Sequence, residues 1–263
     1  MQTAFDRRRV NGPDESFAPV YDPAEEPSTS YASWVEGEPR RGRGALDIRP
    51  IFLKAGLISQ ANGSAYIETE RTKIACAVYG PRQSKSTTFS EKGRLNVEVK
   101  FAPFSCNTRR APLRDAEDRS VAVHIQQSLA QAVRLELLPK SVIDIFVTVI
   151  ESDGNEACVA AGAVAASTAL ANAGIEMLGL VVSCVASTVG KEIWLDPTEE
   201  ESRLAAGTLG FACIPALGTI TSVWQRGSML PVEATRCMEL CQERCTDIHQ
   251  IVAQALLDDV REI

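Results

Sequence analysis

The sequence SDGNEACVAAG places a turn between a buried-looking strand and a helix rich in small residues, with Gly154, Asn155 and Glu156 at the junction. The start of a helix that follows a strand is a natural anion site, because free backbone N–H groups and the positive end of the helix dipole meet there. Here Glu156 places a negative charge on the first turn. A phosphate within roughly 4 Å of that carboxylate would be repelled by up to about 4 kcal/mol at an effective dielectric of 20. The junction therefore indicates an anion pocket that has been closed.

A structural interpretation of the same residues is a helix cap. The side chain of Asp153 or Asn155 would accept a hydrogen bond from the first turn, and such a cap contributes about 0.5–2 kcal/mol. Glu156 would then support the helix through its dipole. Both interpretations can hold together, because a cap that fills the pocket also closes it.

An arginine-rich loop, NTRRAPLRDAEDRS, is the second candidate for chemistry. It carries Arg109, Arg110, Arg114 and Arg119, and Lys100 lies on the strand that precedes it. Guanidinium groups bind phosphate oxygens in pairs, so this loop could hold single-stranded RNA without reading its bases. The alternative is a set of interface ion pairs with the acids of the same loop. The sequence leaves both interpretations open.

Three cysteines, Cys237, Cys241 and Cys245, follow one another at four-residue spacing on the last expected helix. Thiols on such a stripe lie about 6 Å apart per step, too far for one tetrahedral zinc ion with bonds of about 2.3 Å. We therefore expect a packing stripe, and we expect no metal and no cofactor. Most of the eight cysteines lie in apolar segments, which favours reduced thiols and an intracellular protein.

The bulk properties are those of an ordinary α/β protein. The chain has 263 residues, 45% of them hydrophobic, and a formal net charge of −7, which argues against a free-standing nucleic-acid binder. The N-terminus lacks the apolar core of a signal peptide, and no run is apolar enough to span a membrane.

The order of elements predicts an extended or disordered arm over residues 1–45 and one α/β domain over residues 46–263. Two similar strand–helix units and a C-terminal helix should build this domain. The expected strands cover residues 57–60, 65–69, 73–79, 94–101, 178–189, 192–195, 208–214 and 218–224, and a further strand begins at Ser141 and ends at a turn at Asp153 and Gly154. The expected helices cover residues 118–136 and 231–260, and a third helix runs from that turn to Asn172.

Several segments in this order resemble the RNase PH family: LISQANGSAYIETERTKIACAVYGPR, FAPFSCNTRRAPLRDAEDRS, SVIDIFVTVIESDGNEA and FACIPALGTITSVWQRGSM. The resemblance covers residues 48–260. It implies a β-α fold like that of ribosomal protein S5 domain 2, a ring of six such subunits, and 3′-to-5′ RNA phosphorolysis where the site is intact. Within the family, the RRAP loop and the LDPTEEE segment look most like a subunit of the eukaryotic RNA exosome ring.

The resemblance also implies that the phosphorolytic site is degenerate. Active relatives carry Gly-Thr-Arg or Gly-Thr-Ser where this chain has Gly154, Asn155 and Glu156, and they place two aspartates where it has Asp196 and Ser202. One of the glutamates in the PTEEE run could replace the second aspartate. A solvated helix start is the more common role of such a run.

The resemblance thus implies a non-catalytic subunit that shapes the RNA channel of a hetero-hexameric ring. Its partners would be other RNase PH-like subunits, a cap subunit with S1 or KH domains, and single-stranded RNA, and its location the nucleus with the nucleolus and the cytoplasm. One alternative is a phosphorolytic exoribonuclease that holds phosphate with Asn155 and Mg²⁺ with Asp196. A homo-hexameric tRNA-trimming enzyme is another.

Overall fold

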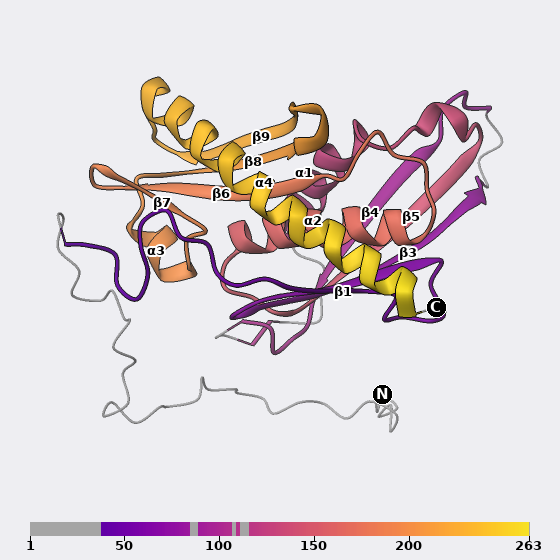
Figure 1. Cartoon of the computed structure of the whole chain (residues 1–263), viewed down its shortest axis with the longest axis horizontal. Helices are drawn as coiled ribbons and strands as arrows, with labels where there is room; N and C mark the ends of the chain where they lie inside the picture. Colours follow the sequence, from indigo (N-terminus) through magenta and orange to yellow (C-terminus); the bar gives the residue numbers. More distant parts are fainter. Residues whose placement is uncertain (1–37, 85–88, 107–108, 111–115, 263) are drawn as a thin grey trace, which may run out of the picture.

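The computed structural model describes residues 38–84, 89–106, 109–110 and 116–262, and it folds them into two β-sheets with helices between and beside them (Figure 1). The first sheet has the order β1 (Phe52–Ala55), β2 (Gly63–Thr69), β3 (Thr72–Gln83), β5 (Ser141–Glu151) and β4 (Arg94–Phe101). The second has the order β7 (Glu192–Leu195), β6 (Val182–Val189), β8 (Gly207–Ile214) and β9 (Thr219–Gly227). All neighbouring strands are antiparallel except β4 and β5.

The helices are α1 (Ala116–Ala130), α2 (Asn155–Asn172), α3 (Glu199–Leu204) and α4 (Pro231–Glu262), with short 3₁₀ turns η2 (Leu135–Leu137) and η3 (Pro215–Leu217). The expected α/β class, with strand–helix units and a C-terminal helix, is confirmed. None of the helices among the described residues is long and apolar enough to cross a membrane.

Helix α2 forms the centre of the core, because it contacts β2 and β3 of the first sheet and β6 of the second. It is apolar on all sides, as a fully buried helix must be. Its small residues allow close approach to the strands. A Cβ at Gly63 would lie 2.3 Å from the carbonyl oxygen of Ala169, so only glycine lets the start of β2 reach the backbone of α2.

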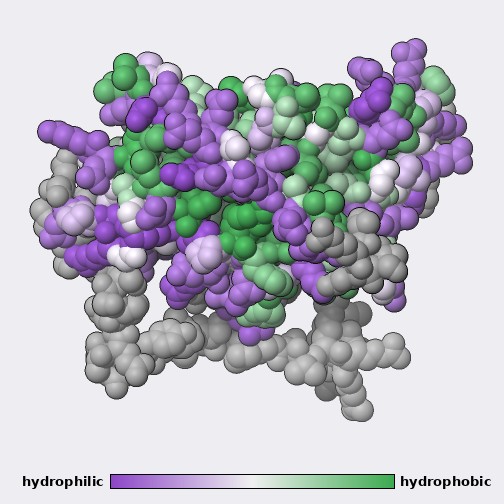
Figure 2. All heavy atoms as spheres, viewed as in Figure 1, coloured by the Kyte–Doolittle hydropathy of each residue, from purple (hydrophilic) through white to green (hydrophobic). Residues whose placement is uncertain are grey.

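Helix α4 lies across the front of the molecule (Figure 1) and contacts β6 and β8 as well as β1. Figure 2 shows hydrophilic side chains along its outer surface and hydrophobic side chains on either side. Cys237, Cys241 and Cys245 form its fully buried stripe, as expected. Among the described residues, no group of three or more His, Cys, Asp or Glu side chains could hold a metal ion.

Several expected elements differ from the structure at their ends: the strand expected over residues 178–189 begins only at Val182, and the strand expected over residues 73–79 continues to Gln83. Two differences are larger. The expected strand over residues 57–60 is a turn, and the first strand is β1 at Phe52–Ala55. Gly56, with a φ of +70°, ends β1 and turns the chain away before Leu57. The expected helix over residues 118–136 ends at Ala130, and η2 follows, because the backbone N–H groups of Ala132 and Val133 both bond to the Leu129 carbonyl.

Candidate functional site

A cleft of about 730 Å³ brings together five of the candidate site residues from the sequence. Gly154, Asn155 and Glu156 at the start of α2 line it, together with Ser202 of α3 and Arg110 of the arginine loop. Asp196 is not among the residues that line this cleft. The structure therefore keeps the anion turn and places only the second position of the acid pair, Ser202, in the cleft lining.

The turn into α2 depends on Gly154, which occupies the cap position with a φ of +99° and a ψ of 156°. Side chains with a Cβ rarely adopt this conformation, so glycine is required. The expected cap from Asp153 or Asn155 is wrong, because α2 has no side-chain cap hydrogen bond. Asp153 instead accepts hydrogen bonds from Arg49 Nη1 at 2.5 Å and from the backbone N–H of Glu199 at 3.3 Å. It ties the α2 turn to the start of α3.

Glu156 is buried, with 6% of its surface exposed, and its Oε1 lies 2.8 Å from Nη1 of Arg226 on β9. No local pattern in the sequence points to Arg226, which lies 70 residues from Glu156 along the chain. This ion pair corrects the expectation of an unpaired charge that repels phosphate, because Arg226 offsets the carboxylate. Both residues line the cleft beside the anion turn, so an ion pair of the protein itself lies next to the helix start.

The other charged side chains of the cleft are paired as well. Arg203 Nη2 lies 2.5 Å from Glu199 Oε1, and both residues line the cleft. Together with Arg110, Arg226 and Glu156, the described residues of the cleft lining include three basic and two acidic side chains. The net charge of about +1 from these described residues gives a weak field for the several anions that phosphorolysis would crowd together.

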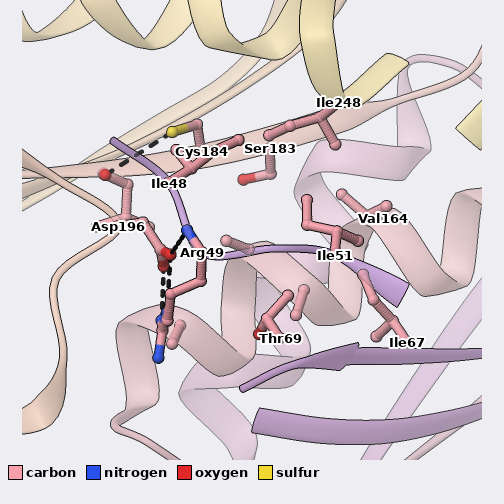
Figure 3. A pocket seen from close by; sticks show the side chains of 14 residues that line it. Ile48, Arg49, Ile51, Ile67, Thr69, Val164, Ser183, Cys184, Asp196 and Ile248 are labelled. Carbon is pink, nitrogen blue, oxygen red and sulfur yellow. Dashed lines mark hydrogen bonds and ion pairs between the residues drawn. The ribbon is translucent and has the colours of Figure 1, made fainter. Parts of the chain in front are cut away.

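Asp196 directly follows β7, and Figure 3 shows the Arg49 side chain beside its carboxylate. The Arg49 side chain donates two hydrogen bonds to the Asp196 carboxylate, from Nε to Oδ2 at 2.7 Å and from Nη2 to Oδ1 at 2.6 Å. The backbone N–H of Arg49 donates a third, to Oδ2 at 3.0 Å. Arg43 Nη1 adds a fourth at 3.2 Å. Burial alone would raise the pKa of Asp196, but these hydrogen bonds and charges outweigh it and lower the pKa to about 2.

Glu201 is the second carboxylate held by arginines. It is almost fully buried. Arg40 donates two hydrogen bonds to its carboxylate, from Nε to Oε1 at 2.9 Å and from Nη2 to Oε2 at 2.6 Å, and Arg43 Nη2 lies 3.2 Å from Oε2. Its Oε2 also accepts the backbone N–H of Thr198, which completes a capping box at α3. The helix start expected at the PTEEE run is confirmed, but the expectation that the run is solvated is wrong for Glu201. This side chain has no oxygen left for a metal.

Residues 38–49, here called the N-terminal strap, supply all three of these arginines. Arg40 is buried and also donates to the Leu195 carbonyl at 2.8 Å, so the strap is fixed to the end of β7. Figure 3 shows Arg49 and Asp196 at one end of an apolar cavity of about 40 Å³ between the two sheets. The strap therefore overlaps the end of the expected arm. Residues 1–37 lie outside the described residues.

The arginine loop is only partly described. Arg110 stacks over the ring of Phe101, 4.0 Å from its centroid, and its side chain lines the cleft. Arg109 and Arg119 are exposed. Lys100 is exposed on β4, 3.2 Å from Glu98. Arg114 lies outside the described residues, so its expected role is not assigned a position.

Comparison with known proteins relates this arrangement to one family. Residues 47–176 match the family described as 3′ exoribonuclease family, domain 1, RNase_PH. The exosome complex component mtr3 of Schizosaccharomyces pombe is 36% identical over 256 residues, covering 96% of each chain. The exosome complex component MTR3 of Homo sapiens is 34% identical over 273 residues, covering 97% of this chain and 96% of that protein.

Solved structures share the fold. Rice (Oryza sativa) Rrp46 superimposes with a TM-score of 0.73 at 19% identity, covering 82% of this chain and 98% of that chain. The Archaeoglobus fulgidus exosome with RNA bound to the active site gives a TM-score of 0.72 at 19% identity, covering 81% of this chain and 92% of that chain. With relatives above 30% identity over nearly its whole length, the chain belongs to the RNase PH family, among the exosome components of the Mtr3 type.

Proposed function

We propose that this chain is a catalytically silent subunit of the RNA exosome ring, which supports 3′-to-5′ RNA processing and degradation by completing the ring and shaping its RNA channel. The engagement of the Asp196 carboxylate by two arginines is the observation that carries the proposal. Ser202 faces the cleft, while Asp196 is bound by Arg49 and Arg43 outside the cleft lining. A metal-assisted displacement requires carboxylate oxygens free to hold the ion, and those of Asp196 and Glu201 are already engaged.

The start of α2 supports the same proposal. Phosphorolysis needs inorganic phosphate held in line with the terminal phosphodiester bond, and the protein must neutralise several anions at once. Here the helix start carries the ion pair of Glu156 and Arg226 instead of a hydroxyl and a free cation. The chain would bind other RNase PH-like subunits, an S1- or KH-type cap subunit and single-stranded RNA. Its location would be the nucleus, with the nucleolus, and the cytoplasm.

The absence of phosphorolytic activity can be tested with a reconstituted ring that contains this chain and lacks any hydrolytic nuclease. We expect the release of nucleoside diphosphates from RNA in phosphate and Mg²⁺ to be the same for wild type and for Ser202→Ala and Asp196→Asn in this chain. Size-exclusion chromatography checks that each variant enters the ring. Phosphate-dependent release that disappears with either assembled variant would establish the phosphorolytic alternative. A stable, active homohexamer of the isolated chain would establish the tRNA-trimming alternative.

We further propose that Arg109 and Arg110, with Arg114, Arg119 and Lys100 nearby, contact RNA in the assembled channel. Replacing Arg109 and Arg110 with glutamate should weaken RNA binding by the ring. It should also reduce the slope of log K against log salt by about 1.4, because each phosphate contact to a single strand contributes about 0.7. Arg244→Glu on α4, where Arg244 pairs with Asp247, is the matched control and should leave the slope unchanged. An unchanged slope in the double variant would assign the pair to protein contacts.

A further inference from the structure

An aromatic side chain projects from the turn that joins β4 to the arginine loop. Phe104 is 73% exposed, whereas the side chain of the next residue, Ser105, is buried at 3% exposure, so the two point in opposite directions. Single exposed apolar side chains are common on protein surfaces. The backbone and the charges around this ring therefore decide what it can bind.

Backbone hydrogen bonds fix the turn that carries Phe104. The N–H of Ala102 bonds to the Val149 carbonyl of β5 at 2.9 Å, and the N–H of Ser105 closes the turn on the Ala102 carbonyl at 2.9 Å. Pro103 is the second residue of this turn, where its fixed φ favours the turn conformation. The ring thus projects from an ordered backbone, so a ligand loses little free energy to ordering the turn.

The same turn is joined to the cleft on both sides of Phe104. The N–H of Ser152 bonds to the Ser105 carbonyl at 2.8 Å, and the N–H of Arg110 bonds to the Pro103 carbonyl at 2.9 Å. Ser152 and Arg110 both line the cleft. Phe104 lies between the two residues whose carbonyls accept these bonds, and this places its backbone at the edge of the cleft.

The charges beside the ring are basic. The ten residues from Phe101 to Arg110 include two arginines and no acidic residue. Arg109 is exposed, and it forms no ion pair with the described residues. The guanidinium group of Arg110 lies 4.0 Å from the ring centroid of Phe101, and this stacking holds it at the cleft.

An exposed aromatic ring between basic side chains complements a single-stranded nucleic acid. Such a strand presents phosphates to guanidinium groups and unstacked bases to aromatic rings. In a duplex the faces of the bases are already stacked, so a duplex offers this ring no partner. The centre of a protein interface, by contrast, gathers several apolar side chains and is depleted of charge. The cations beside Phe104 therefore favour RNA over a protein partner.

We propose that Phe104 is a stacking platform for one base of single-stranded RNA at the edge of the cleft, with the adjoining phosphates on Arg109 and Arg110. This inference rests on the proposed function, and it adds a contact to a base where the arginines contact only phosphates. Because every base has an aromatic face, the platform holds the strand without reading its sequence.

Two substitutions of Phe104 separate stacking from a general apolar contact. Leucine keeps much of the apolar surface but has no aromatic face, so Phe104→Leu should weaken RNA binding by the reconstituted ring about fivefold or more. Phe104→Trp keeps the aromatic face and should bind RNA at least as tightly as wild type. Fluorescence anisotropy with labelled oligouridine measures the Kd. Val232→Ala, at a residue 81% exposed on the first turn of α4, is the control and should bind as wild type does.

The salt dependence of binding separates this contact from those of the arginines. Phe104 carries no charge, so Phe104→Leu should lower log K by the same amount at every salt concentration and keep the wild-type slope against log salt. The double glutamate variant of Arg109 and Arg110 should reduce that slope. A reduced slope in Phe104→Leu would show that the residue acts by positioning the arginines, and would overturn the inference.

A measurement on the wild-type ring does not depend on variants. RNA that contains 5-iodouridine should cross-link on irradiation to the peptide with Phe104, because iodouracil reacts efficiently with an aromatic ring stacked on it. A ring that binds this RNA without the cross-link would overturn the inference, and so would wild-type affinity in Phe104→Leu or equal losses in the leucine and tryptophan variants.

Assembly is followed by size-exclusion chromatography, and thermal unfolding of each isolated variant shows whether its fold is kept. A folded Phe104→Leu chain that no longer enters the ring would assign the side chain to a protein contact and would also overturn the inference. Failure of the wild-type chain to join any ring would instead overturn the proposed function itself.

Discussion

Replacing Arg40 with alanine should lower the free energy of unfolding of the chain by about 3–5 kcal/mol, because it leaves the carboxylate of Glu201 buried without its main partner. The side chains of Arg40 and Glu201 are 1% and 2% exposed, and two hydrogen bonds join them. The variant also removes the donor to the Leu195 carbonyl. Urea unfolding at neutral pH, followed by tryptophan fluorescence, measures the difference.

The neighbouring arginine provides a matched control. Arg41 pairs with Glu38 at 3.3 Å, and these side chains are 31% and 46% exposed. An exposed pair contributes about 0–1 kcal/mol, so Arg41→Ala should be close to wild type. The Arg40→Ala, Glu201→Gln double variant should recover part of the loss, since it no longer buries an unpaired charge. Equal stabilities of the two alanine variants would show that Arg40 is not a structural anchor.

Arg49→Met should lower the free energy of unfolding by about 3–5 kcal/mol and should also change the pH dependence of stability. Arg49 bridges Asp153 and Asp196, and its side chain is 2% exposed. In the wild type, Asp196 has a pKa of about 2 in the folded state, below its ordinary value of 3.8. This difference contributes about 2 kcal/mol above pH 4, and the contribution disappears as the pH falls through about 2.

Methionine at position 49 removes the main cause of that lowered pKa, so the loss of stability between pH 4 and pH 2 should become smaller. The pKa of Asp153 is raised by burial, which the charge of Arg49 only partly offsets. Asp153 therefore acts in the opposite direction, and the variant strengthens its effect. Unfolding midpoints in urea at pH 7, 5, 4, 3 and 2 give the profile. Arg82→Met, at an arginine 58% exposed and paired with Asp144, is the control and should keep the wild-type profile. A wild-type profile in Arg49→Met would contradict the assignment.

The local elements could be predicted where a short pattern determines them. Strict alternation over residues 94–101 predicts β4 with the bounds that the structure has, and Pro231 predicts the start of α4. The strand at residues 57–60 was wrong because Leu57 and Ile58 have strong strand propensity, while the turn at Gly56 depends on packing against Asp259 of α4. Gly56 and Asp259 are too far apart along the chain for any local sequence pattern to include both of them.

In the candidate site, too, some residues could be predicted from the sequence and others could not. The turn at Gly154 and the positions of Asn155, Glu156 and Ser202 could be found from the family resemblance, and the structure brings them into one cleft. Their partners could not be found. Arg226 lies 70 residues from Glu156, and Arg40 lies in a proline- and arginine-rich segment that has the composition of a solvated arm. Which cations become buried is decided by tertiary packing, and the local composition carries no signal for it.

The N-terminal strap has a consequence for the order in which the molecule is completed during synthesis. Arg40 and Glu201 are 161 residues apart, so the ribosome releases the arginine long before its carboxylate partner exists. The first sheet is complete once residue 151 has emerged, and its local hairpins can form without the strap. The beginning of the described chain is therefore among the last parts to reach its final position, and it closes over β7 and α3 after both have formed.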